Sequence, residues 1–152
     1  MKRILLLALS VIMMMTCFVP NTVLADEKTA IAGSADTQSI AETYASGLII
    51  STELTISKDG SKLILYALTD CALSVKKCGF TEIIIQRKKP TSTRWEDHKV
   101  YLDTYTDGTS LEFNKVVTLN SGYQYRATAV HYAKKSIFST QKVSSTTGAL
   151  SF

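Results

Sequence analysis

The cysteines and histidines have the widest range of chemistry among the side chains of this 152-residue sequence. They are Cys17, Cys71, Cys78, His98 and His131. Six residues separate Cys71 from Cys78, a spacing that matches no zinc motif, and both histidines lie far from this pair in sequence. The sequence therefore predicts no metal site.

Acidic residues are dense in one segment only, which contains Glu96, Asp97, Asp103 and Asp107. Paired carboxylates carry out glycoside hydrolysis, but these four lie in a predicted hairpin region, where we expect solvated turn acids. The pattern D-x-x-x-D-G also offers too few oxygen ligands for calcium. The sequence has no G-x-S-x-G nucleophile elbow and no phosphate-binding glycine loop. It therefore predicts a protein without a cofactor that is not an enzyme.

The first 25 residues have the composition of a secretory signal peptide. Lys2 and Arg3 precede an apolar run over residues 4–19, and the motif VLA provides a small-residue cleavage site that ends at Ala25. The run is short for the ~20 residues of a membrane span, so we expect cleavage after Ala25, secretion, and no membrane span afterwards. A retained anchor and a lipid attached to Cys17 are the alternatives.

Cleavage would leave a nearly neutral chain. Without Lys2 and Arg3, 15 basic side chains stand against 13 acidic ones, which is a net charge of +2. The remaining lysine doublets are spread along the chain and are expected to be solvated turn lysines; they are Lys76-Lys77, Lys88-Lys89 and Lys134-Lys135. No basic stripe of the kind that nucleic acids require is present, so we expect no nucleic-acid partner.

Cleavage would also leave two cysteines, Cys71 and Cys78. Because secreted chains fold in an oxidising environment, an even number of cysteines predicts a disulfide. Closing this short loop would contribute about 2.5 kcal/mol in the loop-entropy model. Two free buried thiols are the alternative.

The pattern of apolar and polar residues changes near residue 47. Asp26 to Ser46 is rich in Ala, Ser, Thr and acids without a sustained apolar period, which predicts a flexible leader. A helical turn near Ile40 to Tyr44 is a second possibility. The remaining residues, 47–152, are enough for one domain with one core.

From residue 47 onward the pattern is that of short strands. Leu48, Ile50, Leu54 and Ile56 fall on alternate positions, and an Asp-Gly turn at residues 59–60 leads into the next strand. Further strands are expected over 62–70, 80–88, 111–119, 123–132 and 137–148, with one or two short edge strands within 94–105. About seven strands with almost no helical period predict an all-β fold, a single antiparallel sandwich of two sheets.

The stretch that joins Leu119 to Tyr125, L-N-S-G-Y-Q-Y, continues as Y-R-A-T-A-V. This pattern resembles fibronectin type III domains, an immunoglobulin-like β-sandwich family, and the Leu-to-Tyr spacing is that of the family's tyrosine corner. IIIQRKKPTSTRW upstream and SIFSTQKVSSTTG downstream extend the likeness from Gly47 to Gly148. The chain is also similar to small secreted proteins of unknown function from Gram-positive bacteria that share the G-Y-x-Y-R and Q-R…W elements.

The resemblance implies a structural role for this strand. Tyr125 would bury its ring while its hydroxyl reaches the backbone near the turn. Ala127 and Ala129 would be small because the two sheets approach closely there. His131 has the same parity, and we expect it to be a strand-end histidine rather than a ligand or a base.

Three aromatic residues, Trp95, Tyr101 and Tyr105, fall in the predicted edge segment and form the candidate binding surface. Such rings stack on sugars or anchor a protein partner; the alternative is that Trp95 and Tyr101 cap the core. We therefore expect a secreted, non-catalytic module for recognition or adhesion outside the cell, with a cell-wall glycan or a surface protein as partner. The alternative is a small secreted effector, bacteriocin-like or inhibitor-like. The sequence leaves the oligomeric state open.

Overall fold

The computed structural model describes residues 27–29 and 36–152. The predicted signal peptide, its cleavage site at Ala25 and Cys17 lie outside the described residues. Within them the chain is entirely β, with ten strands and no helix.

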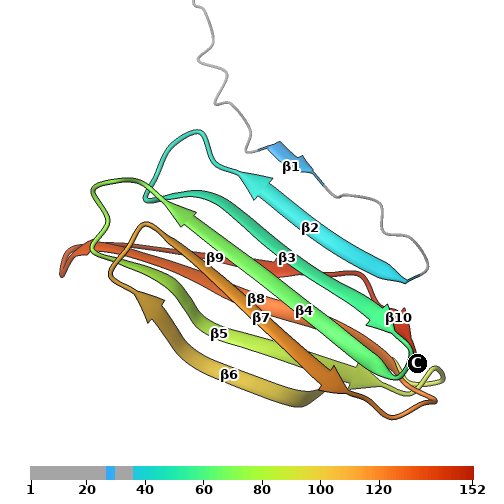
Figure 1. Cartoon of the computed structure of the whole chain (residues 1–152). Coiled ribbons are helices and arrows are strands. Elements are labelled where there is room, and N and C mark those ends of the chain that lie inside the picture. The colour runs from blue at the N-terminus through green and yellow to red at the C-terminus, as the bar shows by residue number, and fades with distance from the viewer. Residues whose placement is uncertain (1–26, 30–35) are drawn as a thin grey trace, which may run out of the picture.

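The strands form two antiparallel sheets that lie face to face (Figure 1). The first has the order β1-β2-β3-β4-β7 and contains β1 (Glu27–Thr29), β2 (Thr37–Thr43), β3 (Ile49–Asp59), β4 (Lys62–Cys71) and β7 (Ser110–Thr118). The second has the order β10-β8-β5-β6, with β9 also paired to β8; it contains β5 (Lys77–Lys88), β6 (Glu96–Thr106), β8 (Gln124–Ser136), β9 (Ser139–Thr146) and β10 (Leu150–Ser151). The predicted two-sheet sandwich is confirmed.

The core lies between the sheets and consists of alternate residues of the central strands. In β4, for example, Leu63, Leu65 and Ala67 are buried, and β8 of the facing sheet buries every second residue in the same way. Full burial of such aliphatic side chains contributes about 1.5–3 kcal/mol each. The β3–β4 turn lies where the sequence predicts it and Gly60 takes a φ of +59°, but Asp59 pairs with Lys62, so the two turn residues are Gly60 and Ser61 instead of Asp59 and Gly60.

A bulge near Thr81 changes which residues of β5 face the core. Cys78 and Phe80 are buried before it, and Ile83 and Ile85 after it, so the inward parity shifts by one residue. On the neighbouring β6, Asp103 has a φ of +52°, the only positive φ among the described non-glycine residues. Because of these two irregularities, the outward-facing parity of β5 changes at Thr81 and that of β6 changes at Asp103.

The predicted flexible leader is wrong for its second half. Thr37–Thr43 form β2, which pairs along its whole length with β3 and buries Ile40 in the core. Ser39 and Thr55 share a hydrogen bond of 2.7 Å between their hydroxyls. The predicted helical turn near Ile40 is also wrong. β2 therefore joins the sheet through backbone pairing, one buried aliphatic side chain and this hydroxyl contact.

Smaller differences concern the strand ends. Residues 96–106 form one long edge strand instead of one or two short ones, and the last strand is interrupted, with β10 continuing the same edge of β8. His131 lies inside β8, so the expected strand-end position is wrong. Tyr125 is fully buried and its hydroxyl donates a hydrogen bond of 3.1 Å to the Asn120 carbonyl, the backbone contact that the sequence predicts.

Candidate functional site

The three aromatic residues of the predicted binding surface do not come together. Trp95 and Tyr105 stand at opposite ends of β6, about 30 Å apart at about 3.3 Å per residue. Tyr101 faces inward and packs edge-to-face on Phe113 with ring centroids 5.0 Å apart. The parity change at Asp103 separates Tyr101 from Tyr105, because it turns one ring to the core and the other to the outer face.

Trp95 is half-buried beneath two cationic groups on the outer face. The Arg126 guanidinium lies 4.3 Å from its ring and the Lys88 ammonium 5.2 Å. Arg126 also donates a 2.9 Å hydrogen bond to Gln86. The ring is therefore already covered, which leaves little of its face for a sugar or a protein partner.

Tyr105 pairs with Tyr132 across a glycine at the other end of this face. Gly79 of β5 is the register partner of both tyrosines, and their rings meet above it with centroids 5.4 Å apart. The Lys77 ammonium sits 4.1 Å from the Tyr105 ring. Burial and a 2.9 Å hydrogen bond to Asp103 raise the pKa of Tyr105 to about 12, so this hydroxyl stays protonated at neutral pH.

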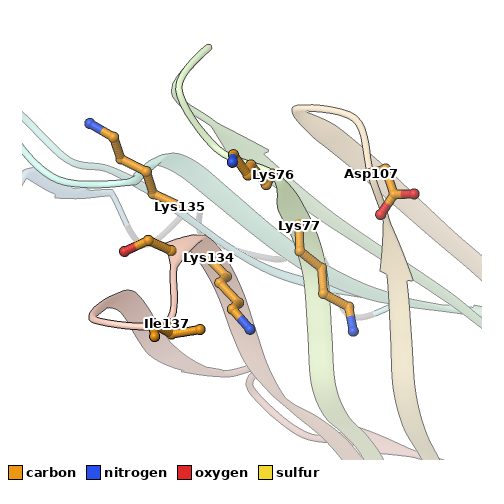
Figure 2. A pocket seen from close by; sticks show the side chains of 7 residues that line it. Lys76, Lys77, Asp107, Lys134, Lys135 and Ile137 are labelled. Atoms are coloured by element: carbon orange, nitrogen blue, oxygen red, sulfur yellow. The ribbon is translucent and has the colours of Figure 1, made fainter.

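Next to the tyrosine pair the structure gathers two of the lysine doublets into one cluster, which we call the basic end. It consists of Lys76, Lys77, Lys134 and Lys135, and it lines a hollow of about 530 Å³ together with Asp107, Ser136 and Ile137. Figure 2 shows Lys77 and Lys134 on neighbouring strands with their side chains pointing the same way, and Asp107 on the β6–β7 turn beside them.

The pairing of β5 with β8 builds the basic end. Lys77 is directly opposite Lys134 in the antiparallel register, and the Lys76 amide donates a 2.8 Å hydrogen bond to the Lys134 carbonyl. The prediction of dispersed turn lysines is therefore wrong for these four. No sequence signal locates the cluster, because 57 positions separate Lys77 from Lys134 and only the strand register joins them.

This arrangement is electrostatically unfavourable for the isolated protein. Like charges directly opposite each other on antiparallel strands are destabilising, by up to about 1 kcal/mol. None of the four ammonium groups has an ion-pair partner among the residues that the structure describes. Of the acids, Asp107 alone lines the hollow, so the basic end keeps a surplus of positive charge for an incoming anion.

The third lysine doublet lies at the opposite end of the sheet. Lys88 and Lys89 line a hollow of about 230 Å³ with Arg94, Glu96 and two further residues. Here Lys88 rests on Trp95 and the Arg87 guanidinium lies 4.0 Å from Glu96. Three cations at this end therefore have an acidic or aromatic neighbour: Arg87, Lys88 and Arg126.

The cysteine pair lies beneath the basic end in a small core of its own. Cys71, Val75 and Cys78 are buried there with Ile49 and Ala133. Both cysteines are free thiols in the structure, and the hydrogen bond between them, followed by burial, raises the pKa of Cys71 far above its usual range. The same hydrogen bond lowers the pKa of Cys78, and it places the two sulfur atoms next to each other.

His131 is fully buried and bridges the two sheets. One ring nitrogen, Nδ1, is 2.7 Å from the Thr69 hydroxyl on β4, and Nε2 is 3.1 Å from the Ser145 hydroxyl on β9. Burial lowers its pKa to about 4. With both nitrogens bonded and no route to solvent, this histidine is a structural crosslink and no substrate can reach it.

The acids of the predicted hairpin region do not converge. Asp97 accepts a 2.9 Å hydrogen bond from Gln86 and Asp103 one from Tyr105, at opposite ends of β6. Across residues 27–29 and 36–152, no three His, Cys, Asp or Glu side chains gather as a metal site would require. The described part of the chain also contains no helix that could span a membrane.

No family model, curated protein or solved structure matches the chain. Its function has to be argued from the basic end itself.

Proposed function

We propose that the protein is a secreted, non-catalytic recognition module that binds a polyanionic ligand at the basic end. The observation that carries the proposal is the lysine cluster itself. Four lysines line one hollow without an ion-pair partner among the described residues, and two of them, Lys77 and Lys134, are directly opposed across β5 and β8 and point the same way (Figure 2). Residues that lower the stability of a fold and make no stabilising contact in exchange are typical of functional sites.

The charge of the basic end suits a polyanionic ligand. Lysines are compact charges with three donors each, so they attract phosphate, sulfate or carboxylate groups without demanding one geometry. Lys77 is steadied by its stacking on Tyr105, and Lys134 by its place in the central strand β8. An anionic cell-wall glycan or an acidic segment of a surface protein is the ligand class that this site would take.

Export and fold family belong to the same proposal. A basic, apolar N-terminus ending in VLA supports secretion. The two-sheet antiparallel architecture and the contact from the Tyr125 hydroxyl to Asn120 support the fibronectin type III resemblance. Adjacent buried thiols support a Cys71–Cys78 disulfide once the chain reaches an oxidising environment.

Binding of the processed protein to polyphosphate and to an anionic cell-wall glycan tests the proposal. Lys134→Glu should weaken binding by about tenfold or more, while stability stays equal or rises, because the new carboxylate faces Lys77. Lys89→Glu makes the same charge change at the opposite end and is the matched control. Equal losses in the two variants, or no binding by the unmodified protein, would refute the proposal.

A further inference from the structure

Three large apolar side chains protrude into solvent at the same end of the sandwich as the lysine cluster. Leu73 is 94% exposed, Ile137 76% and Phe138 92%. Leu73 belongs to the β4–β5 connection, and the other two form the tip of the β8–β9 turn. Figure 1 shows these two connections and the β6–β7 turn together at one end of the two sheets.

The β8–β9 turn has a sequence that folding does not require. Ser136 pairs with Ser139, which leaves Ile137 and Phe138 as the two central residues. Two-residue hairpin turns favour Asn, Asp or Gly with positive φ, as Gly60 illustrates at the β3–β4 turn. Neither Ile137 nor Phe138 has a positive φ. Two apolar residues therefore occupy a turn that polar residues would form better.

The β4–β5 connection presents Leu73 in a similar way. Its backbone closes a turn in which the Val75 amide donates a 3.0 Å hydrogen bond to the Ala72 carbonyl. Val75 is buried against Ile49 and the cysteine pair, so it anchors the loop. Leu73 points away from this anchor, and its exposure is a consequence of a fixed loop rather than of a missing core contact.

We call Leu73 and the pair Ile137 and Phe138 the apolar tips, and each tip lies beside one of the lysine doublets of the basic end. Lys76 and Lys77 follow Leu73 within four residues, and Lys134 and Lys135 precede Ile137. Ile137 also lines the hollow with all four lysines. Apolar side chains that enter the headgroup region, surrounded by lysines that face anionic headgroups, are the chemistry of peripheral membrane binding.

We infer that the basic end docks on the surface of an anionic lipid bilayer, with Leu73, Ile137 and Phe138 entering the boundary between headgroups and acyl chains. The inference rests on the proposed function and names its ligand, because the four lysines supply the anion binding in both. A soluble polyanion would bind the lysines but give the apolar tips nothing to contact. An anionic bilayer would contact both, because its headgroups attract the lysines and its acyl boundary accepts the apolar side chains.

Flotation of the processed protein with vesicles tests this inference. Vesicles of phosphatidylglycerol and phosphatidylcholine in equal amounts should bind the protein, and vesicles of phosphatidylcholine alone should bind it far less. Ile137→Ser with Phe138→Ser should lower binding to the anionic vesicles about tenfold or more, and should leave binding to polyphosphate unchanged. The matched control is Leu102→Ser with Val116→Ser, which removes two exposed apolar residues from the flanks.

The outcomes separate the two proposals. If polyphosphate binds and anionic vesicles do not, the membrane inference is overturned and polyanion recognition stands. Equal vesicle binding by the tip variant and the flank variant also overturns it. If neither polyphosphate nor vesicles bind, both proposals fail. Urea unfolding of each variant shows that any loss is not a loss of fold.

Discussion

Acidification should destabilise the fold through His131. The buried ring has a pKa of about 4 in the folded chain, against about 6.5 in the unfolded chain. Because the unfolded chain takes up the proton first, the contribution of His131 is complete above pH 6.5. It is lost as the pH falls from 6.5 to 4, and it falls no further below 4 because both states are then protonated.

The size of this loss follows from the gap between the two pKa values. At about 1.4 kcal/mol for each pH unit, the gap corresponds to about 3 kcal/mol. Burial is the main cause, and the charge of Glu42 acts weakly in the opposite direction. Since the free energy of unfolding of small domains is about 5–15 kcal/mol, a loss of this size is a large share of the stability.

Urea unfolding between pH 7.5 and 4 measures the effect, with His131→Gln as the variant that cannot titrate. The unmodified protein should lose about 3 kcal/mol more than His131→Gln over this range, because the carboxylates titrate alike in both. His98→Gln is the control, since His98 is only half-buried and makes no contact between sheets. Parallel profiles for the unmodified protein and His131→Gln would show that the buried ring does not carry the pH dependence.

Three further perturbations address the glycine, the cysteines and the tyrosine of this fold. Gly79→Ala should lower the free energy of unfolding by about 3 kcal/mol or more, because Gly79 has a φ of +147° and a Cβ would lie 2.2 Å from the Thr104 carbonyl oxygen. The control is Gly60→Ala, which should lower it by about 1 kcal/mol, because Gly60 has a φ of +59° and open space around it. Equal losses of the two variants in urea unfolding would contradict the steric argument. Oxidation should join Cys71 to Cys78, remove two hydrogens from the intact mass and add about 2.5 kcal/mol of stability that a reductant abolishes; a mass that reductant leaves unchanged would exclude the bond. Tyr125→Phe should cost about 1 kcal/mol through the lost hydrogen bond to Asn120, and an unchanged melting temperature would count against that contact.

The sequence predicts the central strands well because burial imposes a strict period of two on them. In β8 every second residue enters the core, and the alternation is visible without a structure. In β4 apolar residues stand at both parities, which predicts a strand covered on both sides, but only one face is buried. The strand β2 lacks this signal, since Ile40 is its one buried residue and most of its pairing uses backbone groups. A flexible segment and a strand with one buried residue therefore look alike in sequence.

The site could not be predicted, because it depends on register and on irregular backbone. Lys77 and Lys134 meet only through the pairing of β5 with β8, and a shift by one residue would turn one of them inward. The proposed aromatic surface failed for a related reason. Tyr101 and Tyr105 share a parity in a regular strand, but the positive φ at Asp103 breaks that parity.

The departures from regular sandwich structure are concentrated at one end of the second sheet. Lysines oppose each other there across β5 and β8, Gly79 adopts a conformation that other residues rarely take, and a hairpin turn carries Ile137 and Phe138. At the other end of the same strands, Arg87 lies close to Glu96 and the cations rest on Trp95. Both ends are built on the same strands, so the sheet alone does not explain the difference between them. The proposed binding of a ligand at the basic end would explain it, because among the described residues charge, strain and apolar exposure combine there against the stability of the free protein.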